Sequence, residues 1–167
     1  MDIALGSEHA GYRLKERLKE FLVRLGHTYK DYGAYDELPN DDYPLLARQV
    51  SESVVIGEQE RGILICGTGH GMCISANKIP GIRATLCNDL FSAKSAREHN
   101  DSNILVLGAR IIGVELAEEI VRVWLTTGFS GGRHARRLEN IKIIEQDILS
   151  GRYKDKKQVE YGYHSRD

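Results

Sequence analysis

The sequence predicts an α/β fold, a doubly wound domain built on a five-stranded parallel sheet. Short apolar runs alternate with longer stretches whose apolar residues recur at helical spacing, a pattern typical of parallel strands joined by crossover helices. The runs at 63–66 and 104–107 are apolar without interruption, which indicates strands buried on both faces. A chain of 167 residues, 41% of them hydrophobic, suffices for one domain with its own core.

The expected strands cover residues 2–5, 27–32, 63–66, 82–86 and 104–107. The second of these is the most polar, which favours a place near the edge of the sheet. A loop rich in Gly, Pro, Asn and Asp follows it at 33–42.

The expected helices cover residues 12–25, 44–56, 72–78, 89–98, 114–125 and 134–149. Gly26 suits the end of the first helix, Pro44 suits the first turn of the second, and Asp89 suits an N-cap. The core face of the fifth helix is expected at Leu116, Ile120, Val123 and Trp124. The apolar positions of the last helix are Leu138, Ile141, Ile144 and Ile148.

The expected domain organisation is one domain over residues 1–150, followed by a polar C-terminal tail at 151–167. Neither an internal repeat nor a linker divides the first part. The tail is rich in charged and polar residues, which is typical of an end that does not pack into a core.

Composition limits the classes of partner. Lys plus Arg total 23 and Asp plus Glu total 24, so the formal charge of −1 argues against general binding to nucleic acid or to an anionic membrane. No apolar stretch approaches the roughly 20 residues that span a bilayer. The beginning does not resemble a secretory signal, and three cysteines cannot all pair within one chain, so a cytoplasmic protein with reduced thiols is expected.

The candidate site lies where ligands bind to such sheets, outside the carboxyl ends of the strands. Residues 66–71, Cys-Gly-Thr-Gly-His-Gly, follow the most apolar strand and precede a helix. Glycines allow main-chain N–H groups to turn toward one point, which suits a phosphate or a transient oxyanion. The segment is neither a Walker A loop nor a dinucleotide fingerprint. A tight turn without a ligand remains the alternative.

Cys66 is the candidate nucleophile or base, because it stands at the entrance to this loop. The same N–H donors that stabilise an oxyanion also favour a thiolate. Most unpaired cysteines are small buried apolar residues, and this is the expected role of Cys73 and Cys87.

Basic residues form a second, scattered group. Arg133 and Arg137 are four residues apart, so they share a helix face and suit a phosphate through paired donors. A solvated basic helix face is the alternative. His99 can exchange a proton near neutral pH, but it can equally interact with the C-terminal end of its own helix.

Several motifs in a fixed order carry a resemblance to a known family: 6–11 (GSEHAG), 42–44 (DYP), 62–69 (GILICGTG), 76–78 (ANK), 81–84 (GIRA), 99–101 (HND) and 131–134 (GGRH). Over roughly residues 1–148 the chain resembles the ribose-5-phosphate isomerase type B family, which includes the galactose-6-phosphate isomerase subunits. The resemblance implies a Rossmann-like sheet, no metal or organic cofactor, and a homodimer, often paired into a tetramer, with active sites at the subunit interface. It also implies interconversion of an aldose phosphate and a ketose phosphate.

The resemblance assigns roles to individual residues. Cys66 would be the base that moves a proton between C1 and C2, and His99 the acid that helps to open the sugar ring. Thr68 and the loop would hold the enediolate oxygen, with backbone from Gly67, Gly69, His70 and Gly71. The phosphate would bind to His9, Arg133 and Arg137, with Asn100 and Arg110 completing the pocket and Tyr43 lining the substrate.

Two positions depart from the family pattern. Glu8 stands where the family usually has Asp, and His70 stands where it usually has an apolar residue. Both are expected near the substrate. The leading hypothesis is a ribose-5-phosphate isomerase. The alternatives are the same mechanism on a hexose 6-phosphate or a tetrose phosphate, a non-catalytic phosphosugar-binding subunit, and, with less support from the sequence, a cysteine-dependent hydrolase.

Overall fold

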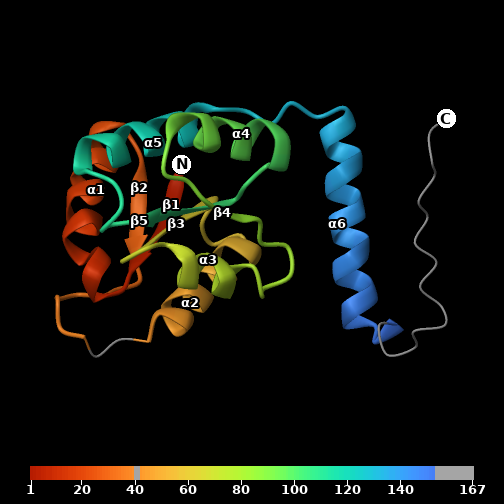
Figure 1. Cartoon of the computed structure of the whole chain (residues 1–167), viewed down its shortest axis with the longest axis horizontal. Helices are drawn as coiled ribbons and strands as arrows, with labels where there is room; N and C mark the ends of the chain where they lie inside the picture. The colour runs from red at the N-terminus through yellow and green to blue at the C-terminus, as the bar shows by residue number, and fades with distance from the viewer. Residues whose placement is uncertain (40–41, 153–167) are drawn as a thin grey trace. The chain divides into compact units, whose positions relative to one another are not determined.

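A five-stranded, all-parallel sheet forms the centre of the computed structural model (Figure 1), which describes residues 1–39 and 42–152. The strands stand in the order β2-β1-β3-β5-β4. Their bounds are β1 Asp2–Ser7, β2 Thr28–Asp31, β3 Arg61–Cys66, β4 Ala84–Leu86 and β5 Ile104–Gly108. The predicted Rossmann-like α/β class and the five parallel strands are therefore confirmed, and the polar strand β2 is at an edge as expected.

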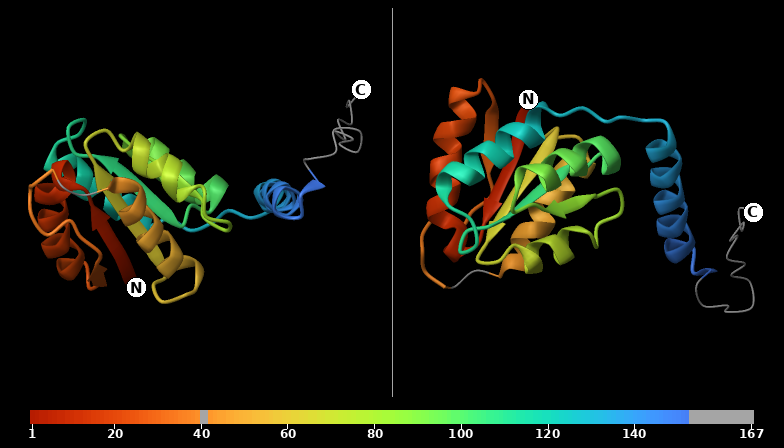
Figure 2. Two further views of the ribbon diagram at one scale, coloured as in Figure 1. Left: turned by 90° about the horizontal axis from the view of Figure 1, so that it is seen from below. Right: turned by 45° about the horizontal axis from the view of Figure 1, so that its top comes forward.

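Helices cover both faces of the sheet (Figure 2), as the doubly wound prediction requires. One face carries α1 (Tyr12–Arg24), α4 (Leu90–Asn100) and α5 (Val114–Thr126). The other carries α2 (Tyr43–Val55) and α3 (His70–Ala76). A short 3-10 helix, η1 (His9–Gly11), joins β1 to α1.

The two faces of the central strand β3 belong to different cores. Ile63 and Ile65 pack with Trp124 of α5, which is fully buried, whereas Leu64 and Cys66 pack with Met72 of α3. This alternation follows from the period of two in a strand. It places the Cys66 side chain on the α2–α3 side, at the carboxyl end of the strand.

The buried face of α5 differs from the predicted one. Ala117, Ile120, Val121, Trp124 and Leu125 are buried, with Val123 packed partly against them, whereas Leu116 is 38% exposed. The buried residues repeat at intervals of three and four, so the apolar stripe is centred one residue later than predicted. Leu116 was therefore wrongly assigned to the core.

The chain divides into two compact units, Met1–Gly131 and Gly132–Asp167, and the second contains α6 (Arg133–Leu149). The predicted C-terminal helix is confirmed. Its expected apolar positions Ile141, Ile144 and Ile148 are exposed, and His134 is the buried residue of this helix. Apart from Gly151 and Arg152, the predicted tail at 151–167 lies outside the described residues.

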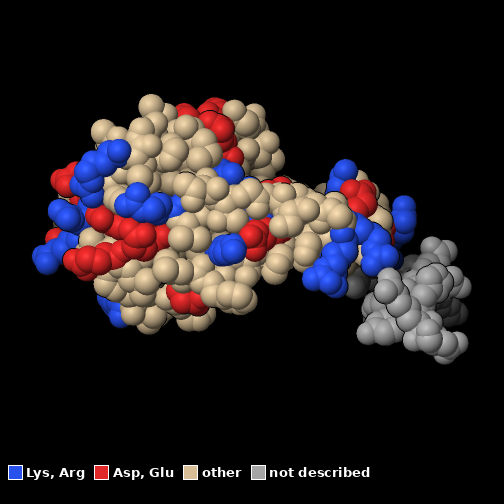
Figure 3. Space-filling view, turned by 90° about the horizontal axis from the view of Figure 1, so that it is seen from above, with Lys and Arg blue, Asp and Glu red and all other residues tan. Residues whose placement is uncertain are grey.

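Surface charge in the first unit is mixed. On the face that Figure 3 shows, basic side chains lie beside acidic ones. Within the described ranges, no helix is long and apolar enough to cross a membrane.

Candidate active site

A cavity of about 350 Å³ opens at the carboxyl edge of the sheet, where β1, β3 and β5 end. Four segments of the first unit line it. They are the residues after β1 (Glu8, His9 and Ala10), the start of α2 (Tyr43), the end of β3 with the loop that follows (Cys66, Gly67, Thr68 and Gly71), and Arg110 after β5. Sites at this edge are expected for open parallel sheets.

Cys66 is the last residue of β3 and is 6% exposed. Its Sγ accepts a hydrogen bond from the main-chain N–H of Gly69 at 3.1 Å. Gly69 itself has a φ of 82°, a conformation that favours glycine and directs the chain into α3. The thiol therefore lies at the wall of the cavity with an amide donor directed at its sulfur.

The other two cysteines have different surroundings. Burial raises the pKa of the Cys73 thiol, and burial likewise raises the pKa of the Cys87 thiol. Neither residue lines the cavity. Cys87 is buried in one core and Cys73 is partly buried against the other, in keeping with the apolar packing role expected of both.

Two site residues pack on glycines of the loop, and for Tyr43 the approach requires the absence of a Cβ. A Cβ at Gly71 would lie 2.7 Å from the ring of Tyr43, and a Cβ at Gly67 would lie 3.5 Å from the guanidinium carbon of Arg110. The ring and the guanidinium thus lie directly on the loop. Tyr43 and Arg110 are exposed on their outer sides, which leaves both able to meet a ligand.

Glu8 and His9 form a pair at the end of β1. Glu8 Oε2 lies 2.8 Å from His9 Nδ1, which fixes the direction of the imidazole. Glu8 is 7% exposed, and its second oxygen, Oε1, has no hydrogen-bond partner among the described residues. A buried carboxylate oxygen without a partner is costly, so a ligand hydroxyl would stabilise it.

A buried lysine supports the segment beside this pair. Lys15 of α1 has no exposed surface, and its Nζ donates to Asp31 Oδ1 at 2.6 Å and to the carbonyl of Ala34 at 2.5 Å. Burial raises the pKa of the Asp31 carboxyl, but hydrogen bonds from Lys15 and Lys19 outweigh it and hold the pKa below its ordinary value. The Ala34 N–H in turn donates to Ser7 O at 2.5 Å, next to Glu8.

This ion pair was missed in the sequence. Its signal was a charged residue inside the apolar stripe of α1, because Lys15 lies between Leu14 and Leu18, both of which are buried. A cation at such a position is expected to have a buried partner.

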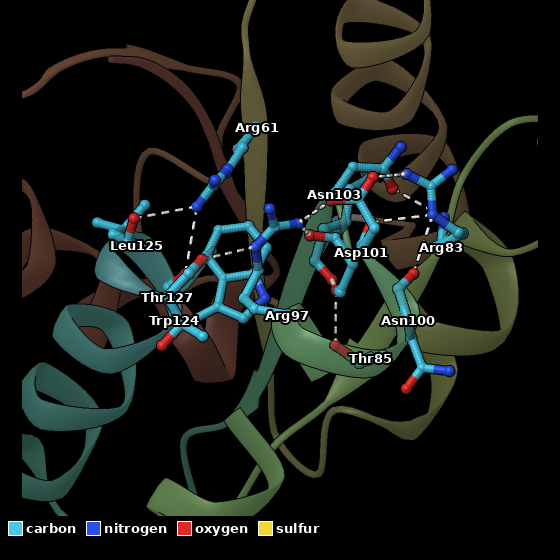
Figure 4. A network of polar contacts seen from close by, with 12 residues as sticks. Arg61, Arg83, Thr85, Arg97, Asn100, Asp101, Asn103, Trp124, Leu125 and Thr127 are labelled. Carbon is cyan, nitrogen blue, oxygen red and sulfur yellow. Dashed lines mark hydrogen bonds and ion pairs between the residues drawn. The ribbon is translucent and has the colours of Figure 1, made fainter. Parts of the chain in front are cut away.

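His99 and Asn100 do not line this cavity. They are the last two residues of α4, which runs antiparallel to the strands, and both are exposed. The carbonyl of Asn100 accepts from Arg83, the residue before β4 (Figure 4), so this turn lies at the amino edge of the sheet. A six-residue strand such as β3 separates the two edges by about 20 Å.

The remaining predicted residues have varied positions. Thr68 lines the cavity, whereas Gly69 and His70 do not; His70 is exposed on the first turn of α3. Arg133 and Arg137 are exposed on α6 in the second unit, where Arg133 Nε lies 3.5 Å from His134 Nε2. In the part of the chain that the structure describes, no group of three or more His, Cys, Asp or Glu could hold a metal ion.

The cavity and its thiol define a small-molecule site on a doubly wound α/β domain, and comparison with known proteins gives its class. The sequence model of the family described as Ribose/Galactose Isomerase matches residues 3–141. The chain belongs to this family, and it is therefore a sugar-phosphate isomerase.

Characterised and named relatives extend over nearly the whole chain. YwlF of Bacillus subtilis, whose name proposes a sugar phosphate isomerase, is 51% identical over 89% of this chain and 100% of that protein. Ribose-5-phosphate isomerase B of Escherichia coli is 46% identical over 86% of this chain and 96% of that protein. D-erythrulose-4-phosphate isomerase of Pectobacterium atrosepticum is 43% identical over 87% of this chain and 95% of that protein.

Solved structures agree with the fold. The structure named ribose-5-phosphate isomerase B from Clostridium thermocellum has a TM-score of 0.87 and 47% identity, covering 89% of this chain and 99% of that one. The structure of ribose-5-phosphate isomerase B from Mycoplasma genitalium, with bound ribulose 5-phosphate, has a TM-score of 0.83 and 37% identity, and the match covers 87% of this chain and 97% of that one.

Proposed function

We propose that this enzyme interconverts D-ribose 5-phosphate and D-ribulose 5-phosphate, with Cys66 as the base. The observation that carries the proposal is the Cys66 sulfur, which lies at the wall of the cavity and accepts the Gly69 N–H at 3.1 Å. The names of the Escherichia coli and Mycoplasma genitalium relatives support this choice of sugar.

In the proposed reaction the Cys66 thiolate removes the proton from C2 of the open-chain aldose. The C2–H electron pair forms the C1–C2 double bond, and O1 becomes the enediolate oxygen beside Thr68 and the loop glycines. Cys66 returns the proton to C1, while the O2 proton moves to O1. The hydrogen travels as a proton, so the chemistry requires no redox cofactor and no metal.

Ring opening and part of the phosphate binding involve residues outside the cavity wall of one subunit. His99 is the proposed acid for ring opening, and Asn100 contacts the substrate. Because these residues are at the opposite edge of the sheet from Cys66 of their own unit, we propose that they act on the cavity of a second copy, in a homodimer or tetramer. The proposed phosphate ligands are His9, Arg110, Arg133 and Arg137.

A tetrose phosphate is the second candidate substrate. Glu8, which lines the cavity, has one methylene more than Asp, so its carboxylate reaches further toward a bound sugar. The Pectobacterium atrosepticum relative is named for a four-carbon substrate. A hexose 6-phosphate remains the third candidate from the family description. Three free cysteines favour a cytoplasmic location.

The base assignment is tested with Cys66→Ala. We expect turnover and the exchange of the C2 hydrogen with solvent to fall by about 100-fold or more, since a general base contributes that much. Affinity for the sugar phosphate should remain nearly unchanged. Cys73→Ala is the matched control and should keep wild-type turnover. The assay uses pentose, tetrose and hexose phosphates with a chelator present; normal turnover by Cys66→Ala would remove Cys66 as the base.

The shared site is tested by mixing inactive subunits. Cys66→Ala and His99→Ala chains, each inactive alone, are co-expressed with different affinity tags. A mixed dimer contains one cavity with an intact Cys66 and an intact His99 from the other chain, so turnover should return to a substantial fraction of wild type. If the purified mixed dimer stays inactive, His99 does not act between subunits.

A further inference from the structure

We propose that Arg83 and Asp101 are positioning residues that hold the turn at His99 and Asn100 in its active orientation. This inference rests on the proposed function, because it concerns the residues assigned there to ring opening and substrate contact. Neither Arg83 nor Asp101 lines the Cys66 cavity. Their contacts are instead with the backbone and side chains of the turn that carries His99 (Figure 4).

Asp101 ends α4 in a left-handed conformation with φ of 44°, the one non-glycine residue with a positive φ in the described part of the chain. Glycine is the usual residue at such a helix end. Asp101 instead adds a carboxylate that binds two arginines, with Oδ2 at 3.0 Å from Arg83 Nη2 and Oδ1 at 2.9 Å from Arg97 Nη1. The strained backbone conformation at residue 101 thus places a carboxylate between two arginines, which a glycine could not do.

Arg83 fastens the backbone of the same turn. Its Nε donates to the carbonyl of Asn100 at 3.1 Å and to the carbonyl of Asp101 at 2.9 Å. The Arg83 main-chain N–H donates to Asn103 Oδ1 at 2.7 Å, which ties the start of β4 to the segment after the turn. The guanidinium therefore contacts two consecutive peptide groups directly after His99.

Arg97 connects the turn to the rigid core. Its side chain is buried, donates to the carbonyl of Ser102, and lies 5.8 Å from the ring centre of Trp124. Arg61 lies 5.2 Å from the same ring. Because Trp124 is fully buried, Arg97 has a fixed position against it. Asp101 is therefore held between Arg97 on one side and Arg83 on the other. The His99 and Asn100 side chains remain exposed on a backbone that is held in place.

The ion pairs of Asp101 are not needed to end helix α4. The Asp101 N–H already bonds to carbonyls of Ala96 and Arg97, which ends the helix without the carboxylate. The Arg83 and Asp101 side chains are 29% and 34% exposed, so the ion pair between them contributes modestly to folding stability, whereas the pair of Asp101 with the buried Arg97 contributes more. Loss of the Arg83 contacts should therefore affect the placement of His99 more than the thermal midpoint, and loss of the Asp101 charge should lower both.

The test uses two variants that separate positioning from folding. Arg83→Met keeps the length of the side chain and removes its donors, and Asp101→Asn keeps a residue that tolerates a positive φ while removing the charge. Turnover of ribose 5-phosphate should fall by about 10- to 100-fold, the cost of misplacing a catalytic group by about 1 Å. Exchange of the C1 hydrogen of ribulose 5-phosphate with solvent requires Cys66 but no ring opening, so its rate at saturating ribulose 5-phosphate, where weaker binding through Asn100 has no effect, should stay within about twofold of wild type.

Arg122→Met is the control for the loss of a guanidinium, because Arg122 forms a more exposed ion pair, with Glu119 of α5, far from the turn at His99, and should keep wild-type turnover. Thermal midpoints are measured for every variant. A merely structural role would lower turnover and C1 exchange by the same factor, and this result would overturn the proposal. Unchanged turnover in both variants would overturn it as well.

Failure of the proposed function is recognised separately, from the wild-type enzyme. If wild type does not convert ribose 5-phosphate, the assigned substrate is wrong. The Arg83→Met chain is then co-expressed with the Cys66→Ala chain, and the mixed dimer is assayed on the sugar phosphate that wild type does convert. In this mixed dimer the Arg83→Met chain supplies the intact Cys66, and the Cys66→Ala chain supplies a His99 that is still positioned by Arg83. Turnover per intact Cys66 should therefore exceed that of the Arg83→Met enzyme alone. No gain would overturn the positioning role.

Discussion

Glu8 is the residue from which we predict the sugar preference of the site. It is buried at the end of β1, one carboxylate oxygen holds His9, and the other has no partner among the described residues. A substrate hydroxyl that reaches Oε1 would relieve this unpaired acceptor, whereas a sugar that cannot reach it would leave the cost in place. Substrate preference is therefore expected to depend on the reach of this side chain.

Glu8→Asp withdraws the carboxylate by about 1.5 Å, the length of one C–C bond. The ratio of kcat/KM for ribose 5-phosphate to that for a tetrose 4-phosphate should rise by about tenfold, since one methylene in a pocket is worth at least that much discrimination. Glu8→Gln keeps the length and removes the charge, so it should lower both values and leave the ratio closer to wild type. An unchanged ratio in Glu8→Asp would show that Glu8 does not set the sugar length.

At the scale of elements, one glycine sets the distance between η1 and β3, on which the cavity depends. A Cβ at Gly11 would lie 2.6 Å from the carbonyl oxygen of Ile65, a main-chain atom that cannot move aside as a flexible side chain could. Gly11→Ala should therefore lower the free energy of unfolding by about 1–3 kcal/mol, the usual cost of overpacking. Gly128→Ala is the control, because a Cβ there meets no atom within 4 Å. Urea denaturation measures both, and equal stability would contradict the close approach.

Most elements follow from local patterns, and the exceptions depend on contacts distant in sequence. The runs at 63–66 and 104–107 predicted β3 and β5 because a strand buried on both faces has no polar positions. The loop after β3 was predicted to face the ligand edge, since parallel strands share that edge. The Lys15–Asp31 pair and the Arg83–Asp101 contact were not predicted, because each joins residues from different elements and requires the sheet order to be known.

At the scale of the whole molecule, the two units raise the question of where the phosphate of the substrate binds. The first unit supplies His9 and Arg110 to the cavity. The second unit carries Arg133 and Arg137, the other two proposed phosphate ligands, which are exposed and share one face of α6. Ile141, Ile144 and Ile148 on the same helix are also exposed, and in the oligomer proposed above this helix would bring the arginines to the cavity of another copy.

Arg137→Ala should weaken binding of ribose 5-phosphate by about 10- to 100-fold, because a hydrogen bond to a charged group contributes about 1.5–3 kcal/mol and each 1.4 kcal/mol is a factor of ten. Arg136→Ala is the matched control, since a neighbouring position points to a different side of α6 and removes the same charge. Titration calorimetry with ribose 5-phosphate and with unphosphorylated ribose separates the contribution of the phosphate from that of the sugar. The loss should be confined to the phosphorylated ligand; equal weakening by the two variants would indicate that only the general positive charge of α6 acts, and that Arg137 is not a phosphate ligand.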